Sequence, residues 1–191
     1  MAFALEIVAD AWLTGPWSPV STATSLAQAL SVAFVVLGDL RYFVLIERDA
    51  APRRAGSSVA IRAVGWSILV PLAVKLAMRA APALFANPRA IFLVYELLFV
   101  ALLLVLRAVV LPRRATAAQE KLGERNASVW IARLTTFELV QYGLWATADI
   151  VLLARGDDND VGLAIRIFPN LMYYVFFLVF VAVTAPRSSR E

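Results

Sequence analysis

The chain has no cysteine and no histidine among its 191 residues, and only 17% of its residues are charged. Without these two residue types it cannot form disulfides, Cys/His zinc sites, His-ligated haem, or Cys and Ser–His nucleophiles. The eight glycines are scattered singly, so the sequence has no glycine-rich phosphate loop. Any acid–base chemistry must use Asp, Glu, Lys, Arg or Tyr, and the sequence points to no catalytic residue, metal or cofactor.

Apolar residues are abundant, since they make up 61% of the chain and give it a mean hydropathy of +0.75. Soluble domains contain roughly 45–50% apolar and roughly 25% charged residues. This composition argues against a soluble domain and against a disordered chain. The formal net charge of +4 is typical of basic cytoplasmic loops in a membrane protein, and we favour that origin over nucleic-acid binding. We therefore expect an integral membrane protein whose main partner is the lipid bilayer.

Five segments of the chain meet the requirement for a transmembrane helix, which is about 20 mostly apolar residues. The links between them are short and carry proline, charge or turn residues, such as the acidic turn Arg155–Asp160. The sequence thus predicts an all-α fold, a polytopic bundle of about five transmembrane helices in one domain over residues 21–186, followed by a cytoplasmic tail at 187–191. The predicted spans are Thr24–Ile46, Val59–Pro82, Pro88–Leu111, Val129–Ala154 and Val161–Thr184.

Residues 1–20 differ from these spans, because Glu6, Asp10, Pro16 and Pro19 interrupt their apolar residues. They lack the basic start and the small-residue cleavage site of a signal peptide. Their two tryptophans fit a helix that lies at the membrane surface. We therefore expect an N-terminal interfacial segment, and the alternative is a short sixth span.

The lysines and arginines of short loops set the orientation of a membrane protein. With the N-terminus outside, ten basic residues fall on the cytoplasmic side, against three on the outer side, Arg79, Arg89 and Arg155. We therefore predict a bacterial inner (plasma) membrane protein with its N-terminus outside and its C-terminus in the cytoplasm. The ten cytoplasmic residues are Arg48, Arg53, Arg54, Arg62, Arg113, Arg114, Lys121, Arg125, Arg187 and Arg190.

Nine ionisable residues lie inside the predicted spans, where a charge at the bilayer centre costs on the order of 2.5–3.5 kcal/mol. Counting depth at about 1.5 Å per residue predicts two layers of charge. The outer layer holds the pairs Lys75–Glu96 and Asp149–Arg166, and the inner layer holds two carboxylates above three arginines. The inner layer consists of Asp39, Glu138, Arg41, Arg107 and Arg133.

Helical spacing gathers polar residues on common faces of the spans. Glu138, Tyr142 and Asp149 follow i, i+4 and i+11, which is one stripe of the fourth span. Asp39 and Glu138 either bind protons or cations, or are neutralised by the arginines and lock the helices together. The candidate path residues are Asp39, Glu138, Gln141, Tyr142, Asp149 and Asn170, and the candidate intramembrane ion pairs involve Lys75, Glu96, Arg107 and Arg166.

Glycine and proline inside the spans predict local packing features. Gly38 and Gly143 are interpreted as points where helices approach closely. Pro71 and Pro169 each remove a backbone hydrogen bond and permit a kink. These residues concern the shape of the bundle and do not discriminate between functions.

Three functions are open at this point. The charged stripes favour a small channel or transporter, as a homo-oligomer, that moves an ion, a proton or a small solute. The alternative is an integral subunit, assembly factor or sensor of a larger membrane complex, because the chain has no soluble domain of its own. A third possibility is a membrane-embedded lipid or isoprenoid enzyme that uses buried carboxylates and phosphate-binding arginines. No motif supports this enzyme, so the residues favour a non-enzymatic role.

Overall fold

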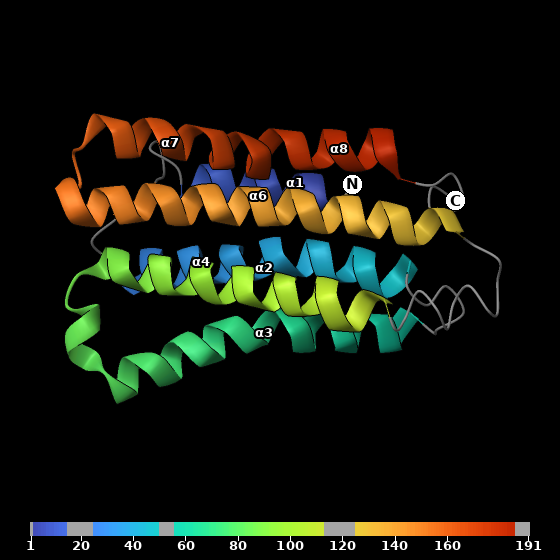
Figure 1. Cartoon of the computed structure of the whole chain (residues 1–191), viewed down its shortest axis with the longest axis horizontal. Coiled ribbons are helices and arrows are strands. Elements are labelled where there is room, and N and C mark those ends of the chain that lie inside the picture. Colours follow the sequence, from blue (N-terminus) through green and yellow to red (C-terminus); the bar gives the residue numbers. More distant parts are fainter. Residues whose placement is uncertain (1, 15–24, 50–55, 113–124, 186–191) are drawn as a thin grey trace.

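The computed structural model describes residues 2–14, 25–49, 56–112 and 125–185, and every regular element in these ranges is helical. Two helices contain a π-helical turn and continue beyond it, so the described ranges hold six helices, which Figure 1 shows lying along the long axis of the molecule. The elements are α1 (Ala2–Thr14), α2 (Ser25–Asp49), α3 (Gly56–Ala80), the short 3-10 turn η1 (Pro82–Phe85), α4 (Pro88–Val105), the π turn η2 (Leu106–Val110), α6 (Arg125–Arg155), α7 (Asp160–Leu171), the π turn η3 (Met172–Phe176) and α8 (Phe177–Thr184).

Four helices of the described chain are long and apolar enough to cross a membrane, Gly56–Ala80, Pro88–Val110, Ser128–Arg155 and Asp160–Thr184. They correspond to four of the five predicted spans, and their ends agree with the prediction to within a few residues. A helix of 25 residues, such as α3, is about 37 Å long and exceeds the roughly 30 Å of a hydrocarbon core. The remaining predicted span, Thr24–Ile46, coincides with the 25-residue helix α2, whose crossing of the membrane stays a prediction.

Two tight turns at the same end of the bundle are fixed by asparagine caps (Figure 1). The Asn87 side chain accepts a hydrogen bond from the backbone N–H of Arg89 at 2.9 Å, and the Asn159 side chain accepts one from Gly162 at 3.2 Å. Gly156 has a φ of +108°, a left-handed conformation that favours glycine. Because both turns are short, α3 and α4, and likewise α6 and α7, are antiparallel neighbours.

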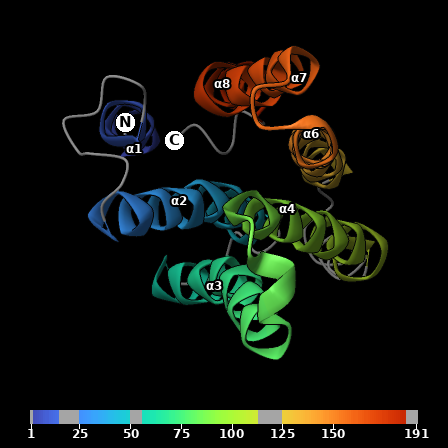
Figure 2. The same ribbon diagram turned by 90° about the vertical axis from the view of Figure 1, so that its left-hand side faces the viewer.

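The end-on view in Figure 2 shows α2 and α4 between α3 on one side and α6 with α7–α8 on the other. The most extensive helix contacts are those of α4 with α6, α6 with α7, and α2 with α3. Aromatic side chains connect these helices, because their rings contact one another in an unbroken series. In order of contact, this aromatic series is Trp66, Phe43, Phe99, Tyr142, Trp145, Tyr173 and Tyr174.

The prolines inside the spans differ in their surroundings. Pro71 lies within α3, which stays α-helical on both sides of it. Pro169 lies near the end of α7 and is followed three residues later by η3. A proline cannot donate a backbone hydrogen bond, and π turns often occur at functional sites. The second π turn is relevant here because it carries Tyr173, which enters the interior of the bundle.

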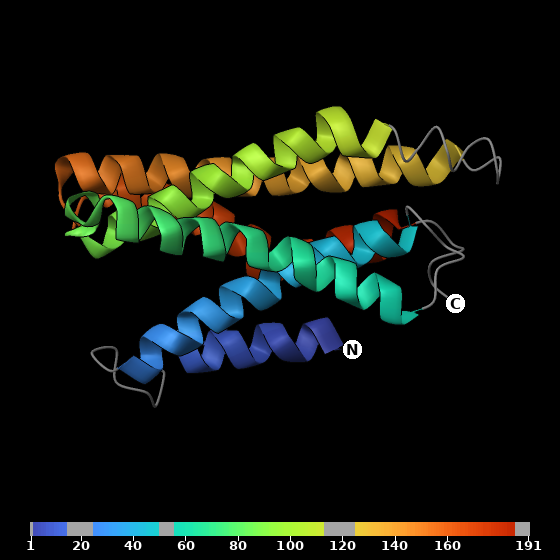
Figure 3. The ribbon, with the colours of Figure 1, turned by 90° about the horizontal axis from the view of Figure 1, so that it is seen from below.

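Helix α1 occupies the predicted interfacial segment, as far as the structure describes it. Figure 3 shows α1 running beside the N-terminal half of α2, in the opposite direction and roughly along the bundle. Its contacts are chiefly with α2. A position of α1 at the membrane surface stays a prediction. Residues 15–20 of this segment, most of the stretch between the third and fourth predicted spans, and the predicted tail 187–191 lie outside the described residues.

Candidate functional site

Asp39 on α2 is the centre of the deeper group of polar side chains. It is 2% exposed and accepts hydrogen bonds from two tyrosine hydroxyls, those of Tyr95 on α4 and Tyr142 on α6. Three helices therefore meet at one carboxylate. A hydroxyl pair of this kind satisfies a buried carboxyl group without neutralising its charge. We call the surrounding residues Glu6, Asp39, Arg41, Tyr95, Glu138, Tyr142 and Tyr173 the inner cluster.

Arg41 is the basic residue of the inner cluster, and it is only 2% exposed. Its guanidinium lies over the rings of Tyr173 and Phe177, with distances of 4.3 and 5.1 Å to the ring centroids. This arrangement provides cation–π attraction inside the bundle. Its Nε lies 3.2 Å from Glu6 Oε2 on α1. This contact is an ion pair without hydrogen-bond geometry, since both Glu6 oxygens and Nη1 of Arg41 lack hydrogen-bond partners among the described residues.

The close approach of α2 to η3 depends on Gly38. A Cβ atom added there would lie 2.5 Å from the hydroxyl oxygen of Tyr173. That hydroxyl donates a hydrogen bond to the backbone carbonyl of Phe34 at 3.2 Å. The predicted close approach is thus confirmed at Gly38. It is wrong at Gly143, where an added Cβ would meet nothing within 4 Å.

Glu138 of the inner cluster lies one helical turn before Tyr142 on α6, and Gln141 is the residue next to Tyr142. Glu138 is 5% exposed and interacts electrostatically with both Asp39 and Arg41. Gln141 is 2% exposed, and its side-chain oxygen has no hydrogen-bond partner in the described ranges. Arg41 interacts with three carboxyl groups, those of Glu6, Asp39 and Glu138. If all three were ionised, three negative charges and one positive charge would leave a net charge of −2 on these four residues.

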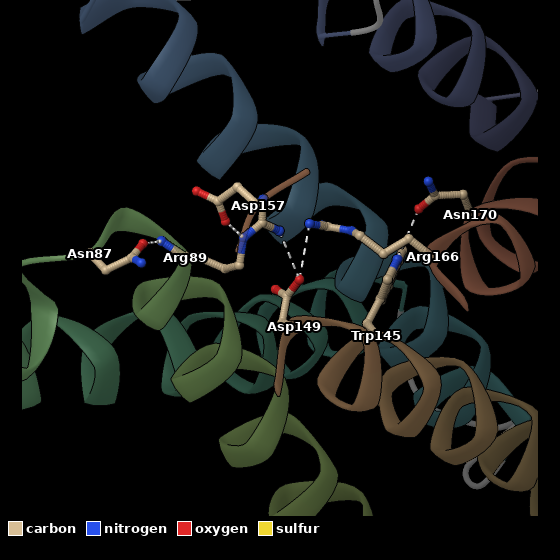
Figure 4. A network of polar contacts seen from close by, with 7 residues as sticks. All are labelled: Asn87, Arg89, Trp145, Asp149, Asp157, Arg166 and Asn170. Atoms are coloured by element: carbon tan, nitrogen blue, oxygen red, sulfur yellow. Dashed lines mark hydrogen bonds and ion pairs between the residues drawn. The ribbon is translucent and has the colours of Figure 1, made fainter. Parts of the chain in front are cut away.

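A second group of charged residues, the outer cluster, lies where α4, α6 and α7 meet near the capped turns. Figure 4 shows Arg89 and Arg166 both pointing toward Asp149. Oδ1 of Asp149 accepts from Nη1 of Arg89 at 3.1 Å and lies 3.0 Å from Nη1 of Arg166. Arg89 also pairs with Asp157 in the turn before α7. The predicted Asp149–Arg166 pair is therefore present. The outer cluster consists of Arg89, Glu96, Asp149, Asp157 and Arg166.

Glu96 belongs to the outer cluster, and its partner differs from the predicted one. Glu96 is 5% exposed and interacts electrostatically with Asp149, Arg166 and Arg89. Lys75, its predicted partner, is exposed on α3. No ion pair joins Lys75 to Glu96 in the part of the chain that the structure describes. The depth estimate placed the two residues at a similar level but could not show that their side chains point in different directions.

The predicted stripe on α6 is buried as a face of the bundle. Glu138, Tyr142 and Asp149 are all buried. Asn170, which was predicted to line the path from α7, is exposed, and it accepts a hydrogen bond from the Trp145 indole at 2.9 Å (Figure 4). It therefore contacts the edge of this stripe.

Two of the three predicted inner arginines lie outside the inner cluster. Arg107 and Arg133 are exposed, and Arg107 donates to the hydroxyl of Thr136 at 2.5 Å. The spacing of eleven residues places Glu96 and Arg107 on one face of a regular helix, but Glu96 is buried while Arg107 is exposed. Arg107 lies in η2, where the helix departs from the regular period of 3.6 residues per turn. Sequence spacing alone therefore misplaced it.

Several site residues were not predicted, because only charged residues beyond the end turns of the predicted spans were candidates. Arg89 and Glu96 are seven residues apart on α4, so their common face was available from spacing. Glu6 and Asp10 are four apart on α1 and could have been identified in the same way. Tyr95 carried no such signal. Glu47, which is fully buried and accepts from Arg62 at 3.0 Å and Trp66 at 2.9 Å, lay just beyond the end of its predicted span.

Within the described ranges, no group of three or more acidic residues could hold a metal ion. No protein-family model matches the chain, and comparison with curated proteins and with solved structures finds no match.

Proposed function

We propose that this chain is a small integral membrane channel or transporter that moves protons through its inner cluster. One observation carries the proposal: Asp39 and Glu138 are both buried, interact with each other, and come from different helices. An ionised carboxylate inside a protein is costly unless a cation or a proton neutralises it. Arg41 interacts with both carboxyl groups but can compensate only one negative charge. Protons on the remaining carboxyl groups provide the rest of the compensation and are exchangeable.

The neighbouring hydroxyl and amide groups support proton movement over movement of a larger solute. Tyr95 and Tyr142 donate to Asp39, and Gln141 contributes a buried oxygen without a donor among the described residues. Chains of carboxyl and hydroxyl groups of this kind serve as proton relays in membrane proteins. Asp149 and Glu96 of the outer cluster offer a second carboxyl pair toward the capped end of the bundle.

For this function we propose the number of spans and the orientation that the sequence predicts. α2 would be the fifth span, and it carries Asp39 and Arg41 into the bilayer. The N-terminus would lie outside the plasma membrane and the C-terminus in the cytoplasm, with copies of the chain associating as a homo-oligomer. The outer cluster would then face the outside, and the inner cluster would lie deeper in the bundle than the outer cluster.

Proton flux into proteoliposomes tests the proposal. We expect Glu138→Gln and Asp39→Asn to lower the flux by at least about tenfold, because each removes an exchangeable proton from the relay. The flux is measured with an internal pH-sensitive dye under an imposed potassium diffusion potential.

Asp158→Asn is the matched control, because Asp158 is an exposed carboxylate in the turn before α7. This variant should keep the flux of the parent chain. Size-exclusion elution and thermal unfolding in detergent show whether each variant is folded. Full flux through folded Glu138→Gln and Asp39→Asn variants would contradict the proposal.

A second candidate is an integral subunit of a larger membrane complex, and exposed charges favour it. Lys75 lies on a helix that could cross a membrane, yet it is exposed. Arg107 and Arg133 are exposed on two further helices of this kind. Such charges reach lipid headgroups or pair with another chain. Native mass spectrometry of the protein extracted from its own membrane separates the two candidates, since a stoichiometric second protein would identify a subunit.

A further inference from the structure

α1 is a short helix that packs mainly against one neighbour in the described chain. It has 13 residues and is about 20 Å long, which is too short to span a membrane. Its buried side chains include Ile7 and Asp10, whereas Leu5, Val8 and Trp12 are each about two-thirds exposed. Its contacts are chiefly with one neighbour, α2. Elements with few buried contacts open at a low free energy compared with the rest of a fold.

The polar contact between α1 and the bundle is incomplete. Glu6 reaches Arg41 at 3.2 Å, and its side chain is only 13% exposed. Both oxygens of this carboxyl group nevertheless lack hydrogen-bond partners among the described residues, as does Nη1 of Arg41. Burying a charged group without hydrogen bonds costs free energy. The docked position of α1 is therefore favoured when Glu6 is protonated and disfavoured when it is ionised.

The groups around Glu6 determine whether the docking of α1 weakens or strengthens as the pH rises. Burial raises the pKa of the Glu6 carboxyl; the Arg41 guanidinium opposes this shift, Asp10 adds to it, and the nearby Tyr173 hydroxyl opposes it. The docked state therefore binds the Glu6 proton more tightly than a released α1 does. Docking is fully favoured below the ordinary carboxyl pKa and weakens as pH rises through the raised value. The titratable and charged groups on this side of the bundle are Glu6 and Asp10 of α1, Asp39 and Arg41 of α2, Tyr95 of α4, Glu138 and Tyr142 of α6, and Tyr173 and Tyr174 of η3.

We propose that α1 is a pH-sensitive lid over the inner cluster, docked when Glu6 carries a proton and released when Glu6 is ionised. Arg41 pairs with Glu6 of α1 at 3.2 Å and also interacts electrostatically with the carboxyl groups of Asp39 and Glu138. The departure of α1 therefore uncovers the cluster and frees Arg41 to interact with Asp39 and Glu138 alone. The lid is a property of the fold, and its role as a regulator of flux rests on the proposed function. In that role, α1 blocks the relay at low pH and opens it at high pH.

Distances between spin labels test the lid directly. The chain has no native cysteine, so labelled pairs can be introduced without other changes. Val8→Cys on α1 with Leu97→Cys on α4 reports the position of α1, and Leu97→Cys with Val140→Cys on α6 is the matched control within the bundle. All three positions are exposed. As the pH is raised from below the ordinary carboxyl pKa into the alkaline range, we expect a second, longer distance to appear only for the Val8 pair.

Two substitutions of Glu6 test whether the protonation of this residue controls the position of α1. Glu6→Gln mimics the protonated residue and should keep α1 docked at every pH, whereas Glu6→Lys faces Arg41 and should release α1 at every pH. A Val8–Leu97 distance that changes neither with pH nor in the Glu6→Lys variant would overturn the lid proposal. Release of α1 in Glu6→Gln at low pH would also overturn it, because the ion pair would then hold α1 in place of the proton. A pH-dependent distance in a chain without proton flux would support the lid and contradict the transport function.

Discussion

Gly38 is a residue at which α2 approaches η3 closely, and it offers a sharp test of packing. Gly38→Ala places a Cβ 2.5 Å from the Tyr173 hydroxyl, so the tyrosine ring or α2 must move. Overpacking of this kind costs about 1–3 kcal/mol, and we expect a loss of that size in the free energy of unfolding in detergent. Gly143→Ala is the control, because nothing lies within 4 Å of its added Cβ. An equal loss in both variants would show that helix interiors, and not this contact, determine the effect.

Residue spacing predicted which positions are buried better than it predicted their partners. The burial of Glu138, Tyr142 and Asp149 follows from the helical period, because residues on one face of a regular helix meet the same neighbours. The partner of Asp39 did not follow, since two uncharged tyrosines bind it from other helices. The predicted pairing of Lys75 with Glu96 was also wrong, because Lys75 is exposed on α3 whereas Glu96 is buried. Depth along a helix is encoded in the sequence, whereas rotation relative to a neighbour depends on packing.

Among the elements, α4, α6 and α7 are joined by the outer cluster. Asp149→Ala would leave the guanidinium groups of Arg89 and Arg166 without their shared carboxylate. Removing one partner of a buried pair costs about 3–5 kcal/mol. We expect a loss near the lower end of that range, because Arg89 and Arg166 side chains are 18% and 29% exposed. Thermal or denaturant unfolding measures it. Asp158→Ala, in the exposed turn nearby, should change stability little, and a comparable loss there would argue against the network.

The long helices themselves were predictable, because about 20 consecutive apolar residues leave few alternatives to a membrane-crossing helix. The two π turns were not, since an extra residue in one helical turn leaves no trace in a hydropathy pattern. This matters for function, because η3 carries Tyr173 beneath Arg41. The packing of α1 along α2 was also missed, because its mixed composition was interpreted as a sign of an interfacial location.

At the scale of the whole molecule, the proposed topology has an odd number of spans and opposite locations for the two chain ends. Single cysteines can be labelled cleanly, since the chain has none of its own. We expect Asp158→Cys to react with a membrane-impermeant maleimide applied to intact cells. Thr116→Cys, in the predicted cytoplasmic link, should react only after permeabilisation. Labelling of both positions from outside would contradict the five-span topology.

The aromatic series has a mechanical consequence for the bundle. Its rings pass from α3 through α2, α4 and α6 to η3, and successive centroids are 4.1 to 6.3 Å apart. Packed rings cannot slide past each other gradually, because a protein interior is as dense as an organic crystal. A rotation of one helix therefore displaces the next ring in the series. The packing of these five elements is therefore coupled. Truncating a ring such as Phe99 would loosen the packing of helices that this ring does not touch.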